Sequence, residues 1–334
     1  MSLLSALVNS LARALRNGAQ AILILSLLYL SIYFCSSLKN MTTYSSALRS
    51  RSLTLWDLPT DYIQNLNESI NKDIPFIYNT SILPTQIPRI IHQTYKTTEI
   101  PSEWLSSHNS CKERNPTFTH KFWTDESARK FIAEHFSWFL PTYDSYPYPI
   151  ERVDSIRYFL LWHYGGVYID LDVSCRRSLD PVLGFAAWFP KTQPYGISND
   201  IMASTAHHPI MLKLALSLQD HKGRFGTGYT TVFWATGPMF VNGILGKWFE
   251  AVNGGEGEDG VKILPPMFYD RTAYSFFGHR EGSSWHGGDV AVAKWAYGRL
   301  WWILTIVALA PAVLMVVGRM RSRRGDKELY SCRV

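Results

Sequence analysis

Two long runs of apolar residues interrupt the otherwise mixed pattern of hydrophobic and polar positions. They cover residues 19–38 and residues 300–318, and neither contains a charged side chain. Each is close to the ~20 residues that a helix needs to cross the ~30 Å apolar layer of a bilayer. A cleaved signal peptide is the alternative for the first run, although such peptides have a shorter apolar stretch of about 7–15 residues. A buried core helix is the alternative for the second, but Trp301 and Trp302 at one end and arginines at the other favour a membrane span.

Between these runs, stretches with the period of a strand alternate with stretches of helical period. Pro101 suits the first turn of a helix, Asp125 is a candidate helix cap, and Gly165 and Gly166 form a helix stop. The predicted elements are strand 87–96, helix 101–116, strand 118–124, helix 125–139, helix 151–164 and strand 167–173. This order predicts an α/β domain with a mostly parallel sheet, whose ligands gather beyond the carboxyl ends of the strands.

The positive charges that flank the apolar runs predict how the chain is oriented in the membrane. Arg13 and Arg16 precede the first run, and a cluster follows the second: Arg319, Arg321, Arg323, Arg324 and Lys327. Both termini are therefore expected in the cytosol, with residues 39–299 on the lumenal side. Three N-glycosylation sequons, at Asn40, Asn67 and Asn79, fall within that loop.

These features divide the chain into six parts. They are a cytosolic N-terminus (1–18), a transmembrane helix (19–38), a lumenal stem rich in Ser, Thr and Asn (39–86), a lumenal domain (87–298), a second transmembrane helix (299–318) and a basic cytosolic tail (319–334).

The net charge of +6 lies at the two ends of the chain. Arg13 and Arg16 contribute +2 and residues 319–334 contribute +4, so that residues 17–318 sum to zero. A domain that binds nucleic acid carries its positive charge in the folded part, and this class is therefore excluded. Cys111 and Cys175 share the predicted lumenal region, where they could form a disulfide or remain free thiols.

Four charged side chains around the last predicted strand carry the candidate chemistry. Asp154 and Arg157 stand three residues apart and share one face of the predicted helix. Asp170 and Asp172 are expected to point the same way from the strand. Two adjacent carboxylates repel each other and favour a divalent cation such as Mg²⁺ or Mn²⁺. A solvated strand end with two turn-forming aspartates is the alternative for these two alone; the complete pattern from Asp154 to Asp172 favours the metal site.

Several runs together resemble glycosyltransferase family 32, the DXD sugar-binding group. They are IPRIIHQTYK, RVDSIRYFLLWHYGGVYIDLDV, ISNDIMASTAHHP, TGPMF and EGSSWH, and they lie within residues 87–290. The two apolar runs and the EGSSWH segment are similar to the fungal inositol phosphorylceramide mannosyltransferases. The resemblance implies a GT-A type, Rossmann-like glycosyltransferase domain between two transmembrane helices.

The resemblance also assigns roles to residues. It implies that Asp170 and Asp172 are metal ligands, with His286 a third metal or diphosphate ligand. Asp154 and Arg157 are implied to hold the donor sugar and phosphate, and Asn199 and Asp200 to lie beside the reacting sugar. Gln93, Thr94 and Tyr95 occupy the place where the family binds the nucleotide base; strand-end packing is the alternative for these three, and a structural role is the alternative for His286.

The activity implied is the metal-dependent transfer of mannose from GDP-mannose to inositol phosphorylceramide, with retention of configuration. The implied partners are a membrane-embedded sphingolipid acceptor and a membrane regulatory subunit, and the implied location is the Golgi membrane. The alternatives are a Golgi mannosyltransferase that acts on glycoprotein N-glycans, whose relatives usually have a single anchor, and a catalytically silent membrane subunit. The intact Asp154, Arg157, Asp170 and Asp172 argue against the second alternative.

Overall fold

The computed structural model describes residues 39–72, 85–192, 196–253, 260–270, 272–280 and 299. Residues 44–287 form one compact unit, and the description below concerns the described parts of that unit. Within the described ranges no helix is long and apolar enough to cross a membrane. Both predicted spans, the basic tail and His286 lie outside the described residues.

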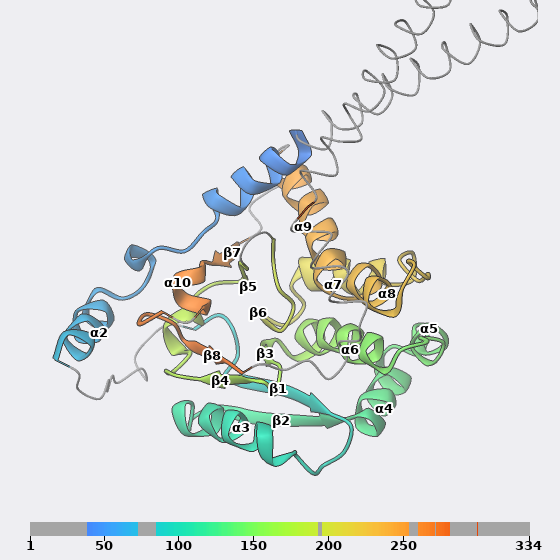
Figure 1. The fold of residues 1–334 in the computed structure, drawn as a ribbon, viewed down its shortest axis with the longest axis horizontal. Helices are drawn as coiled ribbons and strands as arrows, with labels where there is room; N and C mark the ends of the chain where they lie inside the picture. Colours follow the sequence, from blue (N-terminus) through green and yellow to red (C-terminus); the bar gives the residue numbers. More distant parts are fainter. Residues whose placement is uncertain are drawn as a thin grey trace, which may run out of the picture. The chain divides into compact units, whose positions relative to one another are not determined.

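A six-stranded sheet forms the centre of the described fold (Figure 1). In spatial order its strands are β2 (Thr119–Thr124), β1 (Ile90–Tyr95), β3 (Gly166–Ile169), β6 (Ile201–Ser204), β5 (Ala187–Pro190) and β7 (Val261–Leu264). The β2–β1, β1–β3 and β5–β7 pairs are parallel, whereas β6 runs antiparallel to both β3 and β5. The predicted α/β class with a mostly parallel sheet is confirmed, with β6 as the reversed strand.

Helices and a small second sheet cover the central sheet. They are η1 (Leu55–Asp57), α2 (Thr60–Lys72), α3 (Ser102–Arg114), α4 (Asp125–His135), α5 (Leu140–Asp144), α6 (Pro149–Tyr164), η2 (Asp180–Val182), α7 (Pro209–Ser217), α8 (Gly228–Ala235), α9 (Pro238–Asn253) and α10 (Pro266–Tyr269), with β4 (Val173–Cys175) paired antiparallel to β8 (Phe277–His279).

Alternate residues of each central strand enter different hydrophobic clusters. In β3, Tyr168 joins the cluster formed with α4, α6, α7 and α9, whereas Val167 and Ile169 join the cluster formed with α2, α3, β4 and α10. In β6, Met202 belongs to the first cluster and Ile201 to the second. This division follows from the two-residue period of a strand and shows that both faces of the sheet are covered.

Two glycines permit the sharp connection from α6 to β3. Gly165 and Gly166 have φ values of 65° and 98°, in the region that favours glycine. A Cβ on Gly166 would lie 2.6 Å from the carbonyl oxygen of Ile90, which is too close for any side chain. The predicted helix stop is confirmed, and the same pair lets β3 pack directly against β1.

The boundaries of three predicted elements differ from those observed. The helix predicted from Asp125 is capped by Thr124, whose side chain accepts a hydrogen bond from the backbone N–H of Ser127, and it ends at His135. The helix that contains Arg157 starts at Pro149. The strand predicted for residues 167–173 ends at Ile169, and Val173 begins β4 in the other sheet.

The domain also includes residues that precede the predicted boundary at residue 87. The Tyr44 hydroxyl donates a 2.8 Å hydrogen bond to Asn242 of α9. The backbone N–H of Leu53 donates to Ile263 of β7 at 2.8 Å, and Tyr62 stacks on Phe276 with ring centroids 6.2 Å apart. Part of the segment read as a stem is therefore core structure.

Candidate active site

The sheet topology brings three segments with polar side chains to one edge. β1 and β3 are parallel, so Thr94 and Asp170 lie at their adjacent carboxyl ends. β6 is antiparallel to β3 and pairs Ile201 with Ile169, so the residues before β6 reach the same edge. The backbone N–H of Asp170 donates a 2.8 Å hydrogen bond to the carbonyl of Asp200. Polar side chains therefore meet at the edge where the ligands of such sheets are expected to bind.

A buried guanidinium lies at the centre of this edge. Arg157 of α6 is 2% exposed, and its Nη2 lies 2.9 Å from Oδ1 of Asp154 and 3.4 Å from Oδ1 of Asp170. Its guanidinium carbon is also 4.7 Å from the centre of the Tyr168 ring, within the range of a cation–π interaction. The predicted pair on α6 and the first aspartate of the DXD sequence therefore form one connected group.

Asp154 has polar partners on both carboxylate oxygens. Oδ1 accepts a 3.2 Å hydrogen bond from the Asn199 amide as well as the ion pair with Arg157, and Oδ2 accepts a 3.0 Å bond from the Thr236 hydroxyl. Asn199 also donates to the hydroxyl of Tyr158 at 3.2 Å. The amide of Asn199 thus joins the segment before β6 to α6, a contact that the sequence did not predict.

Asp170 is held from the β1 side as well. The Tyr168 hydroxyl donates a 2.7 Å hydrogen bond to Oδ1 of Asp170 and is 2.8 Å from the Thr94 hydroxyl. Because the Tyr168 proton goes to the carboxylate, the Thr94 hydroxyl is the donor in the second bond. Of the three residues predicted at the nucleotide end, Thr94 is the one connected to Asp170 in this way.

The DXD residues lie in a turn, and this corrects their predicted position on a strand. Asp170 follows the last residue of β3, and the backbone N–H of Val173 donates to the Asp170 carbonyl at 3.0 Å. The carbonyl of Asp172 accepts from the backbone N–H of Arg280 at 2.9 Å. The turn forms because the chain leaves the central sheet at Asp170 and pairs with β8 three residues later.

Two residues that the sequence analysis did not single out contact Asp200. The Tyr269 hydroxyl of α10 donates a 2.7 Å hydrogen bond to Oδ2 of Asp200, and Nδ1 of His279 in β8 lies 3.7 Å from the same oxygen. The other oxygen, Oδ1, is buried without a hydrogen-bond partner among the described residues. No local pattern marks Tyr269 or His279, because both reach Asp200 through tertiary packing.

Burial and mutual repulsion act on the carboxylates of this edge. Burial raises the pKa of Asp170 to about 8; Arg157 opposes the rise, whereas Asp172 and Asp200 add to it. Burial also raises the pKa of Asp172, again with a contribution from Asp200, and it raises the pKa of Asp154 against the effect of Arg157. These raised pKa values mean that the ionised carboxylates are unfavourable with Arg157 as the compensating charge, and a bound cation would stabilise them.

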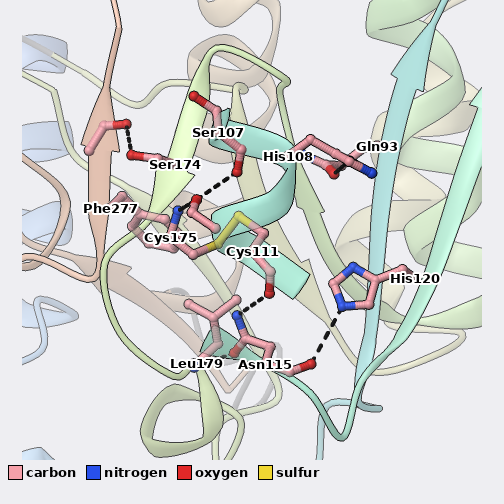
Figure 2. The surroundings of a disulfide bond; sticks show 12 residues. Gln93, Ser107, His108, Cys111, Asn115, His120, Ser174, Cys175, Leu179 and Phe277 are labelled. Atoms are coloured by element: carbon pink, nitrogen blue, oxygen red, sulfur yellow. Dashed lines mark hydrogen bonds between the residues drawn. A yellow bond between two sulfur atoms is a disulfide. The ribbon is translucent and has the colours of Figure 1, made fainter. Parts of the chain in front are cut away.

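Gln93 faces the opposite side of β1 from Thr94. Its side chain is 2% exposed, and its Oε1 accepts a 2.7 Å hydrogen bond from Nδ1 of His108 in α3 (Figure 2). The described contacts include none between the side chain of Tyr95 and the Asp170 group. The nucleotide roles of Gln93, Thr94 and Tyr95 remain predictions, as does the ligand role of His286, which lies outside the described residues.

A disulfide links α3 to the strand that follows the DXD turn. Cys111 and Cys175 are bonded, which resolves the two alternatives left by the sequence (Figure 2). The Ser110 hydroxyl accepts a 3.0 Å hydrogen bond from the backbone N–H of Cys175, adding a second link between the same elements. The disulfide thus fixes the far side of the turn that carries Asp170 and Asp172.

Comparison with known proteins identifies the region that contains this site. Residues 101–188 match the model for the glycosyltransferase sugar-binding region containing DXD motif. Mannosyl phosphorylinositol ceramide synthase SUR1 of Saccharomyces cerevisiae is 45% identical over 232 residues, which are 69% of this chain and 58% of that protein. Inositol phosphoceramide mannosyltransferase 2 of Schizosaccharomyces pombe is 36% identical over 261 residues, which are 74% of this chain and 75% of that protein.

The chain spans between 56% and 60% of the length of three relatives that are 44–45% identical to it. The solved structure of PaToxG glycosyltransferase is also similar, at 18% identity and a TM-score of 0.39, over 58% of this chain and 79% of that one. A likeness at this level carries no argument about the site.

The matched region contains Asp154, Arg157, Asp170 and Asp172, so these charged residues lie within a sugar-binding region of the DXD class of glycosyltransferases. Two relatives are similar to the chain over 75% and 78% of their own length, and they identify the family. The chain belongs to the family of the fungal inositol phosphoceramide mannosyltransferases.

Proposed function

We propose that the protein transfers mannose from GDP-mannose to inositol phosphorylceramide, with retention of configuration. The observation that carries the proposal is the group formed beside the DXD turn by the buried Asp154 and Arg157 with the partly exposed Asp170. The names of the relatives, which are mannosyl phosphorylinositol ceramide synthases and inositol phosphoceramide mannosyltransferases, support the sugar and the acceptor. A GT-A type domain is part of the same proposal.

The described residues fit a divalent cation at the edge of the sheet. Asp170 and Asp172 offer hard carboxylate oxygens, and Oδ1 of Asp200 is buried without a partner among the described residues. No three acidic, histidine or cysteine side chains gather closely enough in the described ranges to hold a metal by themselves. We therefore assign Asp170 and Asp172, with His286 as a further candidate, to Mg²⁺ or Mn²⁺. Such ions commonly complete their coordination with water and substrate phosphates. When bound, the metal would neutralise charge on the donor diphosphate.

Each residue of this group has a distinct task in this proposal. Arg157 presents a fixed positive charge near the place of the departing GDP. Asp154 is proposed to bind hydroxyls of the donor sugar, and the bonds that engage both of its oxygens argue against a role as nucleophile. Asn199 holds Asp154, and Asp200 borders the reacting sugar. We favour front-face transfer, in which the acceptor hydroxyl attacks the anomeric carbon on the side where GDP leaves and gives its proton to the leaving phosphate.

The acceptor and the compartment follow from the same proposal. An acceptor fixed to ceramide stays in the bilayer, so we place the domain on the lumenal side of the Golgi membrane with both termini cytosolic. The disulfide between Cys111 and Cys175 supports an oxidising compartment. A regulatory membrane subunit is included as a proposed partner.

The test compares membranes with and without the full chain after incubation with GDP-mannose and inositol phosphorylceramide. Mass spectrometry should show a sphingolipid heavier by one hexose, formed with the wild-type chain and lost with Asp172→Asn. Cells that lack the chain should lose the mannosylated head group and keep normal N-glycans. Shortened N-glycans with unchanged sphingolipids would instead identify a glycoprotein mannosyltransferase. Mannosylated head groups that are lost without the chain but form normally with Asp172→Asn would indicate a catalytically silent subunit.

A further inference from the structure

A cavity of about 290 Å³ lies between α3 and strands β1 and β2, away from the Asp170 group. Its lining includes Ile91 and Gln93 of β1, His120 and Phe122 of β2, and His108 and Lys112 of α3. Figure 2 shows Gln93, His108 and His120 on one side of α3, while Cys111 of the same helix turns to Cys175. Gln93 is the one residue named here that also has a predicted role in glycosyl transfer, at the nucleotide end, and its bond to His108 directs it to this cavity.

Two buried polar atoms in the lining have no hydrogen-bond partner among the described residues. They are Nε2 of Gln93, a donor, and Nδ1 of His120. Nε2 of His120 faces the carbonyl of Asn115 at 3.4 Å, so the ring proton belongs on Nε2 and Nδ1 is a free acceptor. Buried polar atoms left unpaired are unfavourable, so two such atoms in the lining point to a polar occupant.

His108 extends the same pattern of donors and acceptors. Its Nδ1 carries the proton donated to Oε1 of Gln93, which leaves its Nε2 as a second imidazole acceptor. Burial lowers the pKa of His108 to about 4, with a further contribution from Lys112, so that the ring is neutral near pH 7. The pKa of His120 is lowered by burial as well. An occupant therefore meets the donors of Gln93 and Lys112 and the two imidazole acceptors. Thr98 and Lys121 also line the cavity, and the ammonium of Lys121 lies 4.6 Å from the centre of the Tyr164 ring.

The charge of the lining favours an anion. Lys112 contributes an ammonium group, and none of the described residues that line the cavity is acidic.

The anion must also carry a hydrogen-bond donor for the imidazoles. A carboxylate, a sulfate ester and a phosphodiester have acceptor oxygens only at neutral pH. A phosphate monoester or inorganic phosphate retains a P–O–H group near its second pKa of about 6. Ile91 and Phe122 also line the cavity, where they would contact a small apolar or planar part of a ligand.

We propose that this cavity is a second ligand site that binds a phosphate group bearing a P–O–H, from a small phosphomonoester or from inorganic phosphate. The proton is shared with His108 or His120, and the other oxygens accept from Gln93 and Lys112. The site is separate from the donor-sugar edge, because Thr94 and His92 turn to the opposite face of β1. There Nε2 of His92 bonds the Gly165 carbonyl and Thr94 bonds Tyr168. The inference does not depend on the proposed mannosyl transfer.

Calorimetric titration of the detergent-solubilised full chain at pH 6 tests the proposal. Phenyl phosphate is the ester probe, inorganic phosphate the free-anion probe, and phenyl sulfate the matched anion without a P–O–H. We expect phenyl phosphate to bind at least tenfold more tightly than phenyl sulfate. Tighter binding of phenyl phosphate than of inorganic phosphate identifies an ester as the occupant, and equal binding identifies the free anion. Equal affinity for phenyl phosphate and phenyl sulfate would overturn the proposal.

Three variants and a competition locate the binding. The affinity for phenyl phosphate should fall at least tenfold in Lys112→Gln and in His120→Phe. Arg114→Gln removes a charge from the same helix outside the cavity, and it should leave the affinity unchanged. Lys112 is exposed, so its replacement is not expected to disturb folding. Saturating GDP-mannose should change the affinity less than twofold. Full displacement by GDP-mannose, or wild-type affinity in Lys112→Gln, would show that phenyl phosphate binds elsewhere and would contradict the proposal.

Discussion

Arg157 has a permanent charge at a position that water barely reaches. Taking a guanidinium out of water costs several kcal/mol, which is tolerated only where geometry and hydrogen bonds compensate. Here Asp154 and Asp170 lie within 3.4 Å and the Tyr168 ring adds its face. Arg157 alone does not keep both carboxylates ionised, as the raised pKa of Asp170 shows, and a cation bound beside Asp170 would complete the balance of charge.

Replacing Asp170 by asparagine tests the metal assignment with little change in volume. Asp170→Asn should lower mannosyl transfer at least 100-fold while the protein level in membranes stays normal, because the cation loses one of its two proposed carboxylate ligands. Asp172→Asn should behave similarly. The exposed Asp220→Asn is the matched control and should retain full activity. Transfer above a tenth of the wild-type rate in either DXD variant would contradict the role of that residue.

Glu151 at the start of α6 predicts a pH dependence of stability. Its side chain is 1% exposed and accepts a 3.2 Å hydrogen bond from the backbone N–H of Tyr148. Burial raises the pKa of Glu151 from 4.5 to about 7. The folded state therefore holds this proton up to a higher pH than the unfolded state does. Its contribution to stability is complete below pH 4.5 and is lost as the pH rises to about 7.

Glu151→Gln keeps the hydrogen-bond acceptor and removes the titration. The variant should be more stable than the wild type at pH 8, by an amount on the order of 2 kcal/mol, with the advantage shrinking toward pH 5. Thermal unfolding of the full chain at both pH values measures this. An equal difference in melting temperature at pH 5 and pH 8 would show that Glu151 does not titrate in this window.

At the scale of elements, local sequence patterns were sufficient for α6 and β3 but not for the turn after them. The period of α6 and the pair Gly165–Gly166 are local features, so the spacing from Asp154 to Asp170 was readable. The end of β3 at Ile169 depends on pairing between β4 and β8, about a hundred residues apart, and no local pattern reveals it.

The same distinction separates the predicted site residues from the missed ones. Asn199 was named through family resemblance, but its hydrogen bond to Asp154 depends on β6 running antiparallel to β3. Tyr269 and His279 were missed because only the packing of α10 and β8 brings them to Asp200. The sequence was sufficient to predict the charged motif. The residues that bond to its carboxylates from other elements could be found only from the tertiary structure.

The disulfide between Cys111 and Cys175 closes a loop with a sequence separation of 64 residues. Chain-entropy arguments give a stabilisation of about 4 kcal/mol for a loop of this size. The double variant Cys111→Ala, Cys175→Ala should therefore lower the free energy of unfolding by about 2–5 kcal/mol in denaturant titrations of the full chain. Cys332→Ala is the control and should match the wild type. A double variant as stable as that control would show that the bond does not stabilise the domain.

For the molecule as a whole, the early entry of the chain into the domain core shortens the proposed stem. Tyr44 is 9% exposed and Leu48 is 1% exposed, and both belong to the cluster that includes α6 and α9. A chain truncated at residue 87, the predicted boundary, would lose these contacts as well as the pairing of residues 51–53 with β7. Expression of the domain alone should therefore begin before Tyr44.

The proposed topology predicts which parts of the chain a protease can reach. In sealed microsomes, the domain should be protected and the Arg-rich tail at residues 319–334 removed, because the flanking arginines orient both termini to the cytosol. Immunoblots with antibodies to the domain and to the tail measure both. Detergent should expose the domain as a control. Cleavage of the domain in sealed vesicles, without detergent, would reverse the assignment.

The ion pair between the buried side chains of Asp154 and Arg157 also constrains how this site could change over evolutionary time. Removing one member of a buried ion pair is strongly destabilising, on the order of 3–5 kcal/mol, because it leaves its partner without compensation. A single change at Asp154 or Arg157 therefore passes through a destabilised intermediate, whereas a paired change at both positions avoids it. A library that randomises these positions together should therefore yield functional combinations that one-at-a-time mutagenesis never encounters.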